Sequence, residues 1–177
     1  MVTREILREQ DKVVALLCSA DYYTEEEIIS LIRKMNAWES MPVWRKKKLF
    51  ADELLLEGDY IKSRSEYEST LEMTDLDDQD TAAVYHNIGV TMMHTATAGE
   101  AAEFFRKAFS ISGNEDSLKC CLTAYIMDNR VEEAVSICDD EGLGRDLVKR
   151  CQEEYKRLLE DADASEKIVY MSSEEKT

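Results

Sequence analysis

The segment from Tyr85 to Ser112 constrains the fold more than any other part of the chain, because it has the pattern of two helices that pack closely. It reads YHNIGVTMMHTATAGEAAEFFRKAFSIS, with a polar break at residues 95–97. Apolar residues recur at helical spacing in both halves. Gly89 and Ala101 are small where the two helices would approach each other. The segment therefore predicts a helix pair.

The composition of the whole chain favours helices in the same way. The 177 residues include 6 glycines and 1 proline, which are the residues that usually punctuate strands and loops. No segment alternates apolar and polar residues over the length of a strand. Since 44% of the residues are hydrophobic, the chain can bury a substantial core. We predict an all-α protein of about nine helices.

The order of small and large residues in this segment resembles the tetratricopeptide (TPR) repeat, a helix–turn–helix unit of about 34 residues. With a repeat starting at Ala82, the family's characteristic aromatic, aliphatic, glycine and alanine positions are filled by Tyr85, Ile88, Gly89, Ala101, Phe105 and Ala108. The segment departs from the family pattern at Met92, Ala96 and Ala98, where the family has Tyr, Gly and Tyr.

Two more segments resemble the same repeat, so that three tandem repeats would span residues 44–142. The first starts at Trp44 and places Phe50, Ala51 and Leu54 at interior positions. The third starts at Glu115 and is the weakest match, because the family's glycine position holds Leu122 and its last alanine position holds Glu141. Between the first two repeats, the acidic stretch 73–80 adds about four residues to the usual spacing.

Helices are also predicted on both sides of the repeats. Residues 1–41 read as an N-terminal helix pair, either a divergent repeat or a cap: one helix covers 3–18, and Thr24 begins the second in a capping box with Glu27. Pro42 fits the first turn of the next helix. Residues 143–160 predict a C-terminal capping helix, from about Arg145 to Leu159. We predict one domain over 1–160 and an acidic mobile tail over 161–177.

The charge and the cysteines limit the classes of function and the cellular location that the chain can have. A net charge of −16 and a pI near 4.5 predict that the protein does not bind nucleic acid or anionic membranes directly. No apolar run approaches the roughly 20 residues of a membrane span, and the charged N-terminus lacks a signal-peptide core. Five cysteines without framework spacing predict reduced thiols and a cytoplasmic location.

No constellation of residues predicts catalysis, a metal or a cofactor. His86 and His94 lie two helical turns apart, and no Cys-x-x-Cys or His-Glu-x-x-His spacing occurs. Cys121 and Cys138 fall at interior repeat positions, where a cysteine acts as a small apolar residue. A Gly-rich phosphate loop is absent from the sequence. We therefore expect no catalytic residues, no metal and no cofactor, and an enzyme is disfavoured.

The resemblance implies a right-handed superhelix of antiparallel helix pairs, with a concave groove formed by the first helix of each repeat. Apolar groove positions would flank a mixed-to-basic set, and the implied peptide-binding residues are Arg45, Lys48, Asp52, Leu55, His86, Asn87, Val90, Met93, Lys119, Thr123 and Ile126.

The groove matches the family's carboxylate clamp only in part. Lys48 and Asn87 fit it, whereas Asp52, Asp116 and Cys120 do not. The basic run 45–48 has a second interpretation, in which it only solvates the first turn of a helix.

The function that this resemblance implies is a scaffold or adaptor that binds a protein or peptide partner. The predicted ligand carries apolar anchors and one or more carboxylates, and Asn87 could hold its backbone. The alternative is a peptide-sensing regulatory subunit that acts through a partner. The sequence does not determine the partner or the oligomeric state.

Overall fold

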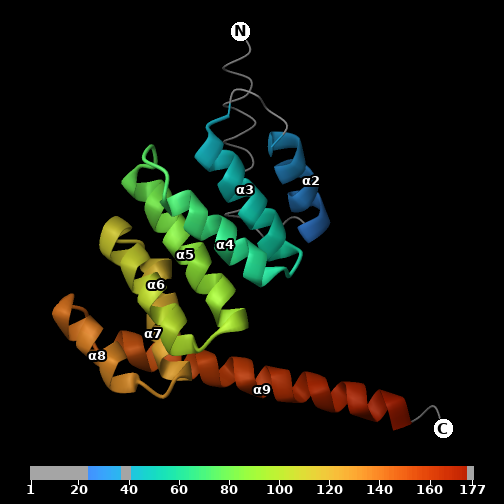
Figure 1. The fold of residues 1–177 in the computed structure, drawn as a ribbon. Coiled ribbons are helices and arrows are strands. Elements are labelled where there is room, and N and C mark those ends of the chain that lie inside the picture. Colours follow the sequence, from blue (N-terminus) through green and yellow to red (C-terminus); the bar gives the residue numbers. More distant parts are fainter. Residues whose placement is uncertain (1–23, 37–40, 175–177) are drawn as a thin grey trace.

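The computed structural model of the protein describes residues 24–36 and 41–174, with the side chains of the last helix described up to Glu160. In these ranges the chain is all-helical and contains no β-strand. Consecutive helices lie side by side, and the last helix packs on the two before it (Figure 1). The helices are α2 (Glu25–Asn36), α3 (Val43–Leu56), α4 (Tyr60–Leu71), α5 (Asp78–Thr95), α6 (Ala98–Ser112), α7 (Glu115–Met127), α8 (Val131–Asp140) and α9 (Asp146–Glu174).

The start of α2 confirms the predicted capping box. The backbone N–H of Glu27 donates to Thr24 Oγ1 at 3.3 Å, and the backbone N–H of Thr24 donates to Glu27 Oε2 at 2.9 Å. Pro42 is the N-cap of α3, one residue before the predicted first turn, with φ −53°. The helix predicted over 3–18 lies outside the described residues.

The turn between α3 and α4 lies where the resemblance places it. Gly58 has φ +80°, a left-handed conformation that glycine adopts without strain. Ala51 and Leu54 are buried as predicted, but Phe50 is 44% exposed. The prediction that Phe50 is interior was therefore wrong, because the described helices leave its side chain partly uncovered.

The acidic stretch before α5 is partly helical. Asp77 caps α5 by accepting the backbone N–H of Asp80 at 2.8 Å, so the helix begins four residues before Ala82. Acidic residues in a first turn interact favourably with the positive end of the helix dipole. The extra residues of the predicted connection therefore lengthen α5 rather than the loop.

Helices α5 and α6 form the most extensive contact in the described structure, and Gly89 makes it possible. A Cβ atom on Gly89 would lie 2.8 Å from Phe105 Cε1. Phe105 and Ala101 are buried, as is Ile88, whereas Tyr85 is half-buried. A second capping box, between Thr97 and Glu100, starts α6.

The pair α7–α8 has the predicted bounds and a buried apolar face. Leu118, Cys121, Leu122, Tyr125, Ala134 and Cys138 are all at most 4% exposed. The turn between the helices uses Asn129 in a left-handed conformation, φ 60°. Because α8 ends at Asp140, Glu141 is an exposed C-cap rather than a buried position.

The last helix, α9, is longer than predicted. Its first turns bury Val148 and Cys151 against α7 and α8, and it then continues to Glu174. The predicted end of this helix near Leu159 was therefore wrong, whereas the mobility predicted for the residues after 160 stays a prediction. That stretch has no Gly or Pro to stop a helix, and Figure 1 shows α9 projecting away from the other helices.

Candidate functional site

An apolar pocket of about 390 Å³ lies between α5, α7 and α9. Its lining contains one aromatic ring from α6, one from α9, and aliphatic side chains from α5 and α9. The apolar lining residues are Val90, Met93, Phe105, Tyr155 and Leu158. The other lining residues are Asp116, Lys119, Cys120, Thr123 and Glu154. Leu158 is 60% exposed, so this wall of the pocket faces solvent.

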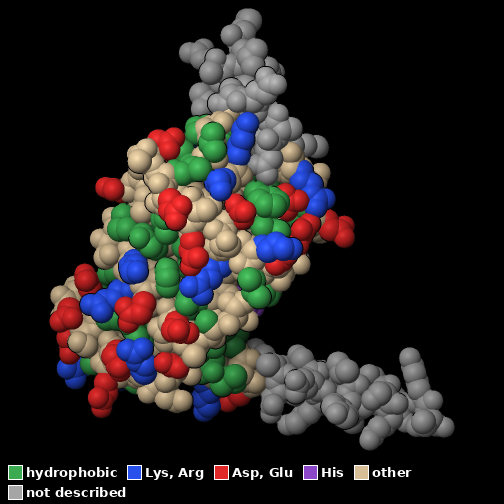
Figure 2. Space-filling model, viewed as in Figure 1, with side chains coloured by type: hydrophobic (Ala, Val, Ile, Leu, Met, Phe, Trp, Pro, Cys, Tyr) green, Lys and Arg blue, Asp and Glu red, His purple; other side chains and the backbone are tan. Residues whose placement is uncertain are grey.

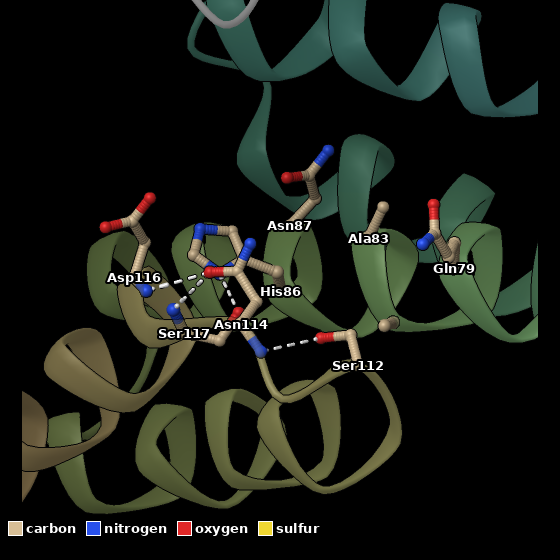
Figure 3. A pocket seen from close by; sticks show the side chains of 9 residues that line it. Gln79, Ala83, His86, Asn87, Ser112, Asn114, Asp116 and Ser117 are labelled. Carbon is tan, nitrogen blue, oxygen red and sulfur yellow. Dashed lines mark hydrogen bonds between the residues drawn. The ribbon is translucent and has the colours of Figure 1, made fainter.

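A second, polar pocket of about 660 Å³ adjoins the first, and Asp116 lines both. It is bounded by the first half of α5 and the start of α7, and its polar lining residues are Gln79, His86, Asn87, Ser112, Asn114, Asp116 and Ser117. Figure 3 shows these side chains around the cavity, with Asn114 hydrogen-bonded to the residues at the start of α7.

The start of α7 is already capped by side chains of the protein itself. Asn114 Oδ1 accepts the backbone N–H groups of Asp116 at 2.8 Å and of Ser117 at 3.2 Å (Figure 3). The first turn also carries two acids, Glu115 and Asp116. The positive end of this helix dipole is therefore compensated internally, which weakens its attraction for an anionic ligand.

His86 connects α5 to α7 at the polar pocket. Its Nδ1 lies 2.9 Å from Ser117 Oγ, and its ring meets the Phe105 ring edge-on with centroids 5.1 Å apart. Burial lowers the pKa of His86 below its ordinary value of 6.5, and the nearby Asp116 charge only partly opposes this effect. The imidazole is therefore neutral at pH 7, and it does not add a positive charge to the groove.

Lys48, Asp52 and Asn87 belong to a polar network that joins α3, α4 and α5. Asp52, only 5% exposed, accepts hydrogen bonds from Lys48 Nζ at 2.9 Å, the Tyr67 hydroxyl at 2.5 Å and Asn87 Nδ2 at 3.0 Å. Tyr67 is fully buried, and burial followed by the Asp52 charge raises its pKa well above the ordinary value.

This network changes the interpretation of the predicted clamp residues. The Lys48 charge is already paired with Asp52, and the Asn87 amide donates to Asp52 and to the Tyr67 hydroxyl. The sequence analysis placed Asp52 in the groove as a residue that does not fit the clamp, and the structure buries it beside Lys48. Lys48 and Asp52 line neither pocket, whereas Asn87 lines the polar one.

The remaining predicted groove residues are divided between pocket walls and core. Val90, Met93, Lys119 and Thr123 line the apolar pocket. Leu55 packs against the core, and Ile126 is only 8% exposed. Arg45 is half-buried at the start of α3 and lines neither pocket. The structure thus brings the α5 and α7 residues together at the pockets, whereas the predicted groove residues of α3 line neither pocket.

Sequence reasoning missed the contribution of α9 to this surface. Tyr155, Leu158 and Glu154 were assigned to a capping helix without a place in the groove, and Phe105 was assigned to the core alone. The apolar stripe of α9 continues past the buried Cys151 to Tyr155 and Leu158. That continuation is the sequence signal for a surface extending beyond the core.

The cysteine thiols in the described ranges are not activated as nucleophiles. Cys120, Cys121, Cys138 and Cys151 are free thiols, and burial raises the pKa of each, to about 12 for Cys121. Among the described residues, His, Cys, Asp and Glu side chains nowhere gather in threes as around a metal ion. None of the described helices has both the length and the apolar character needed to cross a bilayer.

No protein-family model matches the chain, and no curated protein matches it as a relative.

Proposed function

We propose that the protein is a TPR-like interaction module that binds a protein or peptide segment in a concave groove. In this proposal α3–α4, α5–α6 and α7–α8 are successive repeats of a right-handed superhelix, and α9 follows them as a capping helix. The bounds of these three pairs support it, as does the close approach of Gly89 to Phe105. The four free thiols of the described residues are consistent with a reducing, cytoplasmic setting.

The observation that carries the proposal is the pair of adjoining pockets along α5 and α7. A binding site is usually a concave, largely apolar surface with a few polar groups that fix orientation. The apolar pocket supplies anchoring surface, and the neighbouring Gln79 amide can both donate to and accept from a peptide backbone. Asn87 offers its Oδ1 as an acceptor and Asn114 its Nδ2 as a donor, since their other amide atoms already form hydrogen bonds within the protein. Because anchors dominate the affinity of such surfaces, Met93 and Leu158 are central to the proposal.

Site-specific photo-crosslinking in cells of the native host tests this function. A photoreactive amino acid at Thr123, on the pocket wall, should crosslink to a partner, whereas the same group at the exposed Ser136 of α8 should not. Adding Met93→Asp should abolish the Thr123 crosslink. Equal crosslinking from both positions, or a Thr123 crosslink that survives Met93→Asp, would contradict groove binding.

A further inference from the structure

The two pockets together carry an excess of acidic side chains. Among the described residues, Lys119 is the only Lys or Arg that lines either of them, and its Nζ lies 3.8 Å from Asp116 Oδ1. Asp116 and Glu154 are the acidic lining residues. The local formal charge is therefore negative, inside a protein whose net charge is −16.

The other basic groups predicted for the groove do not reverse this sign. Lys48 is paired with the buried Asp52, and His86 is neutral at pH 7. Arg45 lies close enough to Asp80 to lower its pKa, against the larger raising effects of burial and Asp77. Over the face seen in Figure 2, basic and acidic side chains are interspersed, without a large basic patch.

From this charge distribution and the apolar cavity beside it, we infer that the partner segment is apolar and basic. The inference rests on the proposed function and identifies the ligand class of the same site. An aliphatic or aromatic side chain of the partner occupies the pocket between Met93, Phe105 and Leu158. A neighbouring Lys or Arg of the partner lies beside Glu154, on the rim. The carboxylate-bearing ligand predicted from the groove residues is thereby replaced by a cationic one.

Physical reasons favour the cation over the carboxylate. A carboxylate would meet Asp116 and Glu154, and it would share the Lys119 charge with Asp116, whose Oδ1 lies 3.8 Å from Lys119 Nζ. It would gain little from the start of α7, whose N–H groups are capped by Asn114. A cation is attracted both by Glu154 and by the overall field of the acidic protein, which also speeds association at low salt.

Peptide selection tests the sign of the ligand charge. A library of random peptides displayed on phage is selected on the purified full chain at low salt. We expect the bound peptides to combine aliphatic or aromatic residues with Lys or Arg. Selected peptides that bind in the pocket but are rich in Asp or Glu would overturn the inference and leave the proposed function standing.

Two charge-reversal variants on α9 test whether the partner's Lys or Arg lies beside Glu154. Glu154→Lys should weaken a selected basic peptide about three- to tenfold at low salt, and less at high salt. Glu153→Lys is the matched control, since Glu153 is an exposed neighbour outside the pocket lining and its substitution makes the same change in net charge. A loss below about twofold is expected there. Equal losses would show that only total charge matters, and would overturn the site at Glu154.

A separate readout distinguishes failure of this inference from failure of groove binding. Cys120 lines the apolar pocket and is half-buried, so a bound peptide should slow its maleimide labelling, followed by mass spectrometry. Met93→Asp should abolish binding of basic and acidic peptides alike. If no selected peptide protects Cys120 or responds to Met93→Asp, the proposed function itself is wrong.

Discussion

Substituting Gly89 by alanine tests the close contact between α5 and α6. The added Cβ would lie 2.8 Å from Phe105 Cε1 and 2.9 Å from its Cδ1 and Cζ atoms. Carbon atoms in optimal contact are about 3.5–4.0 Å apart. The methyl group therefore overlaps three ring atoms, and either the ring or a helix has to move.

The ring has little room to move. Phe105 is 2% exposed, and the His86 ring rests against it. In an open helix, Gly→Ala would stabilise by about 1 kcal/mol. Overpacking a core costs about 1–3 kcal/mol, and the enclosed ring places this site toward the upper end. We expect a net loss of about 1–2 kcal/mol, or roughly 2–8 °C in Tm.

Urea unfolding followed by circular dichroism measures this loss, and Gly144→Ala is the control. No other residue lies within 4 Å of the Cβ that this control substitution adds, so it should have little effect. Gly89→Ala combined with Phe105→Leu should recover part of the loss, because the smaller side chain makes space. If Gly89→Ala alone raises the free energy of unfolding, the reasoning about this crossing is refuted.

Three further predictions concern buried groups. Tyr67→Phe should cost about 1.5–3 kcal/mol in urea unfolding, because it removes a hydrogen bond to the buried Asp52 carboxylate. Maleimide should modify Cys120 before Cys121, whose burial raises its pKa to about 12. Burial lowers the pKa of folded His86 below 6.5, so the unfolded chain binds its proton first. Stability should therefore fall as pH drops below about 6.5, and His86→Gln should reduce this fall.

Each of these predictions has a control. Tyr60→Phe removes a hydroxyl from a half-buried ring but keeps the stack on His94, so it should change stability by less than about 0.5 kcal/mol. Cys138 should stay unmodified with Cys121, and rapid labelling of either at neutral pH would revive the enzyme interpretation. His94→Gln is the control for the pH series, and equal effects at both histidines would contradict the assignment to His86.

The helices could be predicted because periodicity and capping are local properties of the sequence. The bounds of α7–α8 and the turn between α5 and α6 follow from apolar spacing, and the start of α2 follows from Thr24 and Glu27, whereas α5 begins four residues before the predicted start at Ala82. The placement of Val90 and Met93 on a pocket wall follows from their helical spacing within a repeat. Their role in binding remains a prediction.

The remaining features depend on contacts that local patterns do not encode. The TPR resemblance assigns Phe50 to an interior position. Whether its side chain is buried depends on a neighbouring helix, and in the structure it stays partly exposed. The sequence alone indicates a surface acid at Asp52, because its hydrogen-bond partners Tyr67 and Asn87 lie on other helices. The continuation of α9 reflects the absence of a stop signal, whereas the sequence prediction ended the helix where the apolar stripe became sparse.

The polar network around Asp52 has a consequence for how the protein bends and opens. Apolar side chains tolerate small sliding movements, but hydrogen bonds require particular distances and angles. The hydrogen bonds among Asp52, Tyr67 and Asn87 therefore fix the position of α3 and α4 along α5. In the proposed repeat array, the units would otherwise open one at a time. We expect α3–α4 to exchange amide hydrogens together with α5, and Asn87→Leu to let the first pair open on its own.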